Sequence, residues 1–167
     1  MTYIHPTAVI YPNVVIGENV YIGAHCIIGA EPEWKGFEDA NKGVIIGNNV
    51  RITGLVTIDG GAGKPTYIGD GCYLMKGVHI GHDAVIGNDV TISCGAKVGG
   101  HTVVGDGCNI GLNAVLHQKI FVPMGCMIGA SAFVGKKTEL QAFRKYAGVP
   151  AKDIGSNDRN SISKLPA

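Results

Sequence analysis

An aliphatic residue recurs at every sixth position over most of this chain, and no other feature constrains the fold as strongly. Neither the 3.6-residue period of an amphipathic helix nor the two-residue period of an alternating strand fits this spacing. A six-residue period predicts a parallel β-helix, in which three hexads make one turn and successive turns stack about 4.8 Å apart. The series runs Ile4, Ile10, Ile16, Ile22, Ile28, Ile46, Ile52, Ile58, Ile68, Leu74, Ile80, Ile86, Ile92, Val98, Val104, Ile110, Leu116, Val122, Ile128, Val134.

The residues that follow each aliphatic position fit the corner of a triangular coil. The next residue is often glycine, as at Gly17, Gly23 and Gly81, and glycine relieves steric strain where a chain bends. The residue four positions on is small or branched, and it faces the interior. Four of the five cysteines occupy this position, so we expect buried thiols that pack as small hydrophobic groups, without disulfide or metal roles: Cys26, Cys72, Cys108, Cys126. Cys94 falls at a corner.

Two segments interrupt the repeat, and the chain leaves it near its end. The pattern is absent from residues 31–43, and residues 59–66 contain a four-residue insertion. Loops on a rigid scaffold commonly carry binding residues, although solvated loops without a function fit the same spacing. We expect a repeat domain over residues 1–137. A C-terminal extension over 138–167 should begin as a short helix or an irregular segment and end in a polar tail that frays.

Composition indicates one compact domain without a strong charge bias. The 167 residues carry a net charge of +1, so neither nucleic acid nor a membrane surface is an expected partner. No apolar run reaches the roughly 20 residues that a membrane span needs. The N-terminus enters the first repeat without a signal peptide. A cytoplasmic protein is therefore expected.

Three of the six histidines gather along one edge of the predicted coil. Residues one turn apart stack, so Gly100 lies above His82 and Gln118 above Gly100. His101 and His117 stand in the neighbouring registers of the same edge. A single corner histidine is more often a solvated surface residue. An imidazole can nevertheless take a proton at neutral pH, and a glycine N–H beside it can hold an oxyanion. The cluster is therefore a candidate site.

At these residues the chain resembles a known family. The segment from His79 to Gln118, with HIGHD, GGH and HQ in coil register, resembles the acyltransferases that acylate UDP-N-acetylglucosamine in lipid A biosynthesis. It also resembles enzymes that N-acylate amino sugars on nucleotide carriers, and the resemblance covers residues 4–155. It implies an all-β, left-handed parallel β-helix, although parallel crossovers usually favour the right hand. It also implies a homotrimer with sites in the clefts between protomers.

The resemblance assigns roles to individual residues. It implies that His82 is a general base, that Asp83 belongs to the same catalytic group, and that the Gly100 N–H forms an oxyanion hole. Residues implied to contact substrate are His101, His117, Gln118, Lys35 and His79. Residues implied to lie near the acyl donor are Gly111, Gly129, Ala130 (the acyl-length ruler position) and Lys152. Lys152 belongs to the segment YAGVPAK, which is similar to the closing segment of acetyltransferases that use coenzyme A.

The expected activity is transfer of an acyl group to an amine or hydroxyl of a nucleotide-linked sugar, in cell-surface polysaccharide biosynthesis, without a permanently bound cofactor or metal. The lipid A enzymes continue into a helical domain that helps engage acyl carrier protein, and this chain stops before one. Acetyl- or another short acyl-CoA is therefore the expected donor, and O-acylation from acyl carrier protein (acyl-ACP) is the alternative. A zinc hydratase like the γ-class carbonic anhydrases is a further alternative, but the histidine expected five residues beyond His82 is Gly87. The last alternative is a solenoid without catalytic function.

Overall fold

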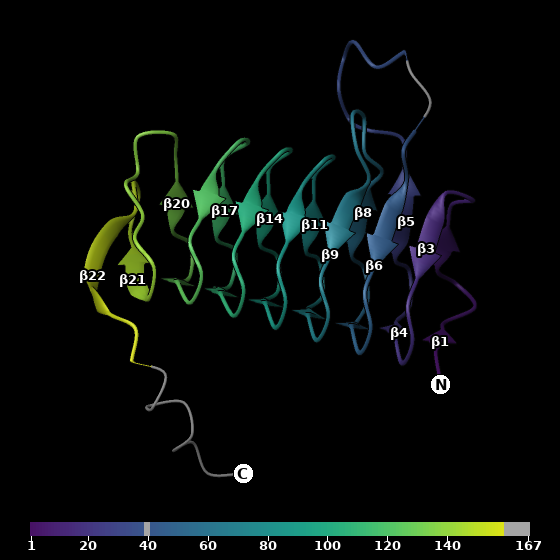
Figure 1. Cartoon of the computed structure of the whole chain (residues 1–167), viewed down its shortest axis with the longest axis horizontal. Coiled ribbons are helices and arrows are strands. Elements are labelled where there is room, and N and C mark those ends of the chain that lie inside the picture. The colour runs from purple at the N-terminus through teal and green to yellow at the C-terminus, as the bar shows by residue number, and fades with distance from the viewer. Residues whose placement is uncertain (39–40, 159–167) are drawn as a thin grey trace.

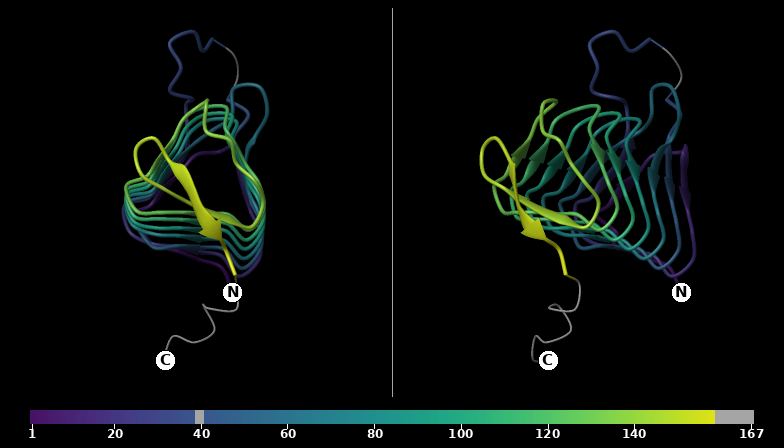
Figure 2. Two further views of the ribbon diagram at one scale, coloured as in Figure 1. Left: turned by 90° about the vertical axis from the view of Figure 1, so that its left-hand side faces the viewer. Right: turned by 60° about the vertical axis from the view of Figure 1, so that its left-hand side comes forward.

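The chain winds into a triangular prism whose coils stack along one axis (Figures 1 and 2). The computed structural model describes residues 1–38 and 41–158. Each coil contributes one short strand to each of three sheets, which we call sheets A, B and C, and neighbouring coils pair in parallel. The described residues include no helix, and so none that could cross a membrane. The predicted left-handed parallel β-helix is confirmed.

The three sheets contain nine, seven and six strands. Sheet A comprises β1 (Tyr3–Ile4), β4 (Tyr21–Ile22), β7 (Arg51–Ile52), β10 (Tyr73–Leu74), β13 (Thr91–Ile92), β16 (Asn109–Ile110), β19 (Met127–Ile128), β21 (Arg144–Ala147) and β22 (Lys152–Ser156). Sheet B comprises β2 (Val9–Ile10), β5 (Ile27–Ala30), β8 (Thr57–Asp59), β11 (His79–Ile80), β14 (Lys97–Val98), β17 (Val115–Leu116) and β20 (Phe133–Val134). Sheet C comprises β3 (Val14–Ile16), β6 (Val44–Ile46), β9 (Thr66–Ile68), β12 (Val85–Ile86), β15 (Val103–Val104) and β18 (Phe121–Val122).

The periodic aliphatic residues form three columns inside the prism, one behind each sheet. In sheet B, for example, Ile80 pairs with Val98 and both side chains are fully buried. Each buried aliphatic side chain contributes about 2 kcal/mol of transfer free energy. The prediction that all twenty are buried is wrong in the first coil. Ile4 is 41% exposed, and Ile10 and Ile16 are only partly buried, because no coil lies beneath them.

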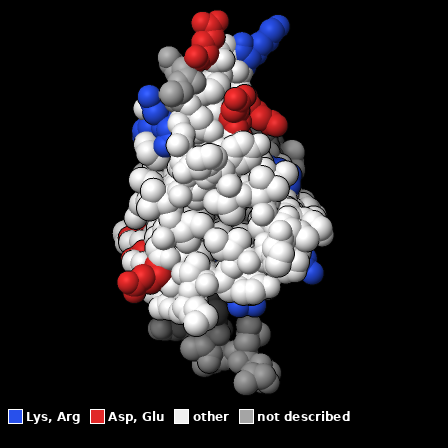
Figure 3. Space-filling model, turned by 90° about the vertical axis from the view of Figure 1, so that its right-hand side faces the viewer, with Lys and Arg blue, Asp and Glu red and all other residues white. Residues whose placement is uncertain are grey.

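The two ends of the prism differ in structure. Figure 3 looks onto the N-terminal end, where most of the surface is uncharged. At the other end the antiparallel pair β21–β22 crosses the triangular opening (Figure 2). Tyr146 follows Ile128 in the column of sheet A, and its buried hydroxyl accepts a hydrogen bond from the Gln141 N–H at 2.6 Å. The hairpin therefore acts as a cap on the core.

Two forms were expected for the start of the C-terminal extension, a short helix or an irregular segment, and the structure shows the irregular segment. Residues 138–141 are irregular, residues 142–143 form a turn, and β21 follows. The tail is expected to fray, and from residue 159 onward it lies outside the described part of the chain.

Four cysteines face the core, as the repeat register predicts. Cys26, Cys72, Cys108 and Cys126 are each at most 1% exposed, and all five cysteines are free thiols. Burial raises the pKa of Cys72 to about 11, so this thiol stays protonated at neutral pH. The buried cysteines therefore serve as small packing groups, whereas Cys94 is half-buried at a corner.

Candidate active site

One edge of the prism gathers both insertions and the clustered histidines. At this edge, which we call the BC edge, each strand of sheet B turns into the next strand of sheet C. The two insertions follow β5 and β8, which are both strands of sheet B, so they project from the BC edge side by side (Figure 1). The turns 81–84 and 99–102 continue the same edge along the prism. The fold therefore places the loops next to His82.

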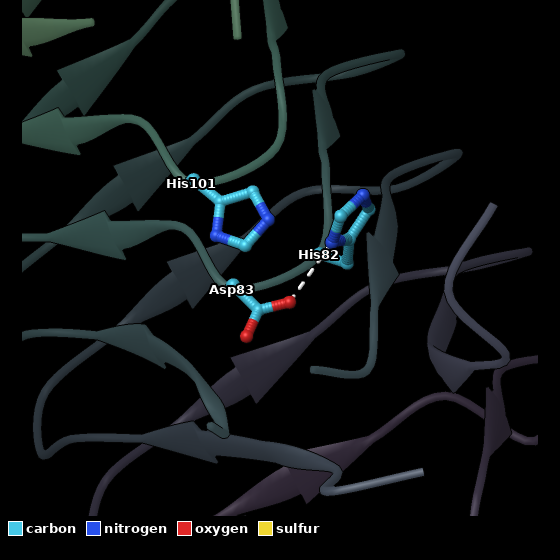
Figure 4. A group of neighbouring side chains, drawn as sticks. All are labelled: His82, Asp83 and His101. Carbon is cyan, nitrogen blue, oxygen red and sulfur yellow. Dashed lines mark hydrogen bonds and ion pairs between the residues drawn. The ribbon is translucent and has the colours of Figure 1, made fainter. Parts of the chain in front are cut away.

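His82 and Asp83 form a hydrogen-bonded pair on the turn after β11 (Figure 4). Nδ1 of His82 lies 2.8 Å from Oδ2 of Asp83. An ionised carboxylate has no proton to donate, so Nδ1 must be the donor. The neutral ring then leaves the lone pair of Nε2 free. Nε2 is therefore the atom that can take a proton from a substrate.

The buried carboxylate of Asp83 also holds the second insertion in place. The backbone N–H groups of Ala62, Gly63 and Lys64 donate hydrogen bonds to it at 2.8–2.9 Å. Burial raises the pKa of Asp83, but the hydrogen bonds from His82 and from these amides outweigh that effect and lower the pKa to about 2. Each carboxylate oxygen accepts two hydrogen bonds. The loop and the imidazole are thus fastened to one ionised group.

Gly100 lies against the imidazole of His82 from the next coil. A Cβ at residue 100 would meet Nε2 of His82 at 2.9 Å. No acceptor for the Gly100 N–H lies among the residues that the structure describes. At the edge between sheets C and A the corresponding amides are capped, because the Asp70 N–H donates to Asn88 and the Asn88 N–H to Asp106. Gly100 instead keeps an open donor beside the base, as an oxyanion hole requires.

A cavity of about 530 Å³ opens over His82. Its volume is typical of a small-molecule site. His101 packs edge-on against His82, with the ring centroids 5.0 Å apart. The lining residues are Trp34, Ala62, Gly63, His82, His101, Gln118 and Lys119.

The first insertion contributes a residue that the sequence reasoning missed. Trp34 lines the cavity, whereas Lys35, the candidate in that loop, is exposed and is not among the lining residues. The sequence contains a signal for Trp34, because it is the only tryptophan in the chain and lies in a segment that departs from the repeat. That signal did not show which way its side chain points.

His79 lies in a different cavity, on the outer face of sheet B. Its Nδ1 is 2.8 Å from the Thr57 hydroxyl, and its Nε2 is 3.8 Å from the carboxylate of Asp59. Burial raises the pKa of Asp59, and the nearby His79 opposes that shift. Glu33 and Lys97 also line this cavity of about 580 Å³. The structure therefore separates His79 from the cavity over His82.

His117 lines a third cavity, of about 550 Å³, further along the BC edge. Its Nδ1 donates to the Gln118 carbonyl at 3.0 Å, and its ring packs edge-on against Phe133. Three lysines share the cavity, namely Lys136, Lys137 and Lys152. We call it the lysine cavity.

The candidate residues thus divide into groups. His82, Asp83, Gly100, His101 and Gln118 come together around the first cavity. Those placed elsewhere are Lys35 on the exposed loop, His79, His117 and Lys152 in the other cavities, and Gly111, Gly129 and Ala130 on the edge between sheets A and B.

The zinc alternative can be tested against the same geometry. Ligand atoms of His82, Asp83 and His101 lie within 4.8 Å of one another. Both oxygens of Asp83 already accept hydrogen bonds, and Nδ1 of His82 is bound to one of them. Two imidazoles then remain, which is fewer than the three protein ligands of a catalytic zinc site. These residues fit an acid–base pair better than a metal site.

Comparison with known proteins gives consistent matches. The family described as "Bacterial transferase hexapeptide (six repeats)" matches residues 1–30, 65–100 and 83–118. A UDP-3-O-acylglucosamine N-acyltransferase of Dechloromonas aromatica is 52% identical over 50 residues, which are 30% of this chain and 14% of that protein. An acyl-[acyl-carrier-protein]–UDP-N-acetylglucosamine O-acyltransferase of Campylobacter lari is 43% identical over 56 residues, covering 32% and 21%. The chain thus spans a small part of these two relatives.

A solved structure matches over a much larger share of the chain. The UDP-N-acetylglucosamine O-acyltransferase of Moraxella catarrhalis superimposes with a TM-score of 0.78 at 27% identity. The superposition covers 98% of this chain and 78% of that protein.

Proposed function

Because this chain belongs to the bacterial hexapeptide-repeat transferase family, we propose that it transfers an acyl group to an amine or hydroxyl of a nucleotide-linked sugar. The observation that carries the proposal is the free Nε2 of His82, a residue that lines the first cavity, beside the N–H of Gly100, for which the described residues offer no acceptor. The printed names of the relatives, which are acyltransferases acting on UDP-linked sugars, support the acceptor class.

The reaction follows from the groups in the cavity. Nε2 of His82 takes a proton from the acceptor as its oxygen or nitrogen attacks the thioester carbonyl. The ionised Asp83 stabilises the imidazolium that forms, and the Gly100 N–H stabilises the negative charge on the carbonyl oxygen. Collapse of the tetrahedral intermediate breaks the carbon–sulfur bond. His82 returns its proton to the departing thiolate, so the base is regenerated.

Acceptor binding falls to the polar residues around the first cavity. His101 and Gln118 offer hydrogen-bonding groups to sugar hydroxyls, and the Lys119 ammonium suits a phosphate oxygen. The adjacent residues Trp34 and Glu33 each line one of two cavities, so we assign His79, in the cavity on sheet B, to another part of the same acceptor. Lys35, exposed on the first insertion, would contact the bound acceptor from the loop.

The donor is proposed to be a thioester on a phosphopantetheine arm. The lysine cavity lies on the BC edge, where Lys136 stands three coils from His82, a separation of about 14 Å. Phosphate groups held by Lys136, Lys137 and Lys152 would leave the arm lying along the edge toward the base. We propose a short acyl-CoA as this donor. Acyl carrier protein carries the same arm, and the name of the Campylobacter lari relative favours it as the second candidate.

Assembly into a homotrimer is part of the proposal. The outward residues of sheet C are all apolar or aromatic: Val15, Ile45, Tyr67, Val85, Val103 and Phe121. Val85 and Val103 are half-buried, and the other four are exposed. The outward faces of the other sheets carry charged residues such as Arg51 and Lys97. Sheet C also borders the BC edge, so a neighbour packed on it would wall the cavities. Gly111, Gly129 and Ala130, on another edge, would reach the donor only from such a neighbour.

A thiol-release assay tests the activity. Acetyl-CoA and longer acyl-CoA donors are combined with a panel of nucleotide sugars and nucleotide amino sugars. His82→Ala should lower turnover by roughly 10²–10⁴-fold, the usual contribution of a positioned base, and by less for an amine acceptor, which is already nucleophilic. His5→Ala, at a half-buried histidine of the first coil, is the control. Equal rates for His82→Ala and the wild type with every acceptor would remove His82 from the mechanism.

A further inference from the structure

Trp34 presents an unusually open aromatic surface to the candidate site. It lines the same cavity as His82, yet its side chain is 56% exposed. The local turn fixes its position: the Trp34 N–H donates to the Pro32 carbonyl at 2.8 Å, and the Phe37 N–H donates to the Trp34 carbonyl at 3.0 Å. A Cβ on Gly36 would lie 3.3 Å from the indole. The backbone of Trp34 is thus held by its own loop, and the ring lies beside Gly36 and is not packed into the core.

The cavity beside it has two walls of different chemistry. Trp34, Ala62 and Gly63 come from the two insertions and present apolar surface and backbone. The turns of the coil supply His101, Gln118 and Lys119, which are polar or charged. A pyranose ring has the matching division, because its C–H groups form an apolar face and its hydroxyls form a polar rim. Aromatic side chains provide large, rigid contact surfaces for such faces.

We infer that Trp34 determines acceptor specificity by stacking on the sugar ring that receives the acyl group. The inference rests on the proposed function, which supplies the sugar. The ring nearest the reacting atom must occupy the cavity of His82, so it is the acylated sugar, while the nucleobase lies beyond the diphosphate. The preceding residue, Glu33, lines the neighbouring cavity. The first insertion therefore separates the cavity assigned to this ring from the one assigned to another part of the acceptor.

Intrinsic fluorescence tests the contact directly, because Trp34 is the only tryptophan in the chain. The full chain is titrated, without an acyl donor, with UDP-N-acetylglucosamine, with N-acetylglucosamine 1-phosphate and with UDP. We expect the two sugar-bearing ligands to quench or shift the emission at saturation, and UDP alone to leave it unchanged. An equal response to UDP would assign Trp34 to the nucleobase and overturn the inference. Absence of a response to every ligand would also overturn it.

Steady-state kinetics give an independent readout. Trp34→Ala should raise the KM for the acceptor by about 10- to 100-fold, the range expected for loss of one aromatic stack, with a smaller change in kcat. Trp34→Phe should restore most of the affinity. Glu38→Ala, an exposed position on the same insertion, is the control. An unchanged KM in Trp34→Ala would overturn the inference and leave the proposed function standing. Fluorescence responses without acyl transfer by the wild type would refute the proposed function alone.

Discussion

The imidazole of His82 occupies the space that a side chain on Gly100 would need. A Cβ at residue 100 would lie 2.9 Å from Nε2, closer than real contacts allow. Glycine at this position therefore does two things at once: it admits the ring of His82 from the coil below, and it leaves its own N–H open beside the nitrogen that takes the proton.

Gly100→Ala should therefore impair catalysis without unfolding the coil. The added methyl group displaces the imidazole, and a displacement of about 1 Å in a catalytic group costs roughly 100-fold in rate. We expect kcat to fall by that order, with the thermal midpoint of unfolding little changed. Leu112→Ala, at the same corner position on the edge between sheets A and B, is the matched control. Wild-type turnover in Gly100→Ala would show that the ring of His82 does not depend on this space.

Asp83→Asn should make the free energy of unfolding less dependent on pH in the acid range. The folded-state pKa of Asp83 is lowered from 3.8 to about 2, so its ionised form stabilises the fold above about pH 4. That contribution disappears as pH falls through the folded-state pKa. The shift corresponds to roughly 2 kcal/mol. Urea unfolding should show the variant less stable than the wild type at about pH 7, with the difference shrinking toward about pH 2.

The control for this substitution is Asp89→Asn. Asp89 is an exposed corner aspartate with a similar left-handed backbone, φ 53° against 58° for Asp83. Asparagine tolerates that conformation well, so neither substitution should fail for backbone reasons. A stability difference between Asp83→Asn and the wild type that stays constant from about pH 7 to about pH 2 would contradict the assignment of an ionised clamp.

Most of the prism could be predicted from the sequence because a large aliphatic residue faces the core at every sixth position of each coil. The same period places His82 below Gly100, because no gap interrupts the repeat between them. It does not predict that both insertions leave the edge that carries the histidines. The spacing of 18 residues between Ile28 and Ile46 equals one full turn, yet Ile46 pairs with Ile16, and only the structure places Ile28 and Ile58 in the column of Ile80.

Other parts of the site depend on conformation that no period describes. The amides of residues 62–64 reach Asp83 only because the second insertion folds back onto the turn after β11. Trp34 and Lys35 are neighbours in sequence, and only the loop's path decides which one lines the cavity. The exposure of Ile4 has a similar origin, since the repeat does not show that the first coil lacks a neighbour below it.

A charge on the outer face of sheet C should disrupt the proposed trimer. Val103 points outward from β15, which lies between β18 and β12 on this apolar face. Val103→Lys would place an ammonium group in a desolvated interface, which is costly without a partner. Light scattering should show trimers for the wild type and smaller species for the variant at micromolar concentration. Val115→Lys, on the outer face of sheet B, is the control. A stable wild-type monomer would refute the assembly.

The proposed donor can be tested by competition. The enzyme should prefer a short acyl-CoA to the corresponding acyl carrier protein, because the lysine cavity offers three ammonium groups to the phosphates of coenzyme A, at one end of the edge that leads to His82. The measurement is the ratio of kcat/KM for acetyl-CoA and for a hydroxyacyl carrier protein with the same acceptor. Lys136→Ala combined with Lys137→Ala should raise the KM for acetyl-CoA by about tenfold. A tenfold change corresponds to ~1.4 kcal/mol of binding free energy.

Lys76→Ala is the control for that double variant, because Lys76 is exposed on the edge between sheets A and B. Raising the salt concentration should weaken acetyl-CoA binding in the wild type more than in the double variant, since salt screens contacts between exposed charges. Depantetheinylated coenzyme A should compete with acetyl-CoA only while the lysines are present, because it retains the phosphates and lacks the thioester.

A carrier protein that outpaces acetyl-CoA by more than tenfold in kcat/KM, a barrier difference above ~1.4 kcal/mol, would reverse the donor assignment. The lysine cavity would then be expected to hold the single phosphate of the carrier's phosphopantetheine arm, and the double substitution should raise the KM for the carrier protein instead.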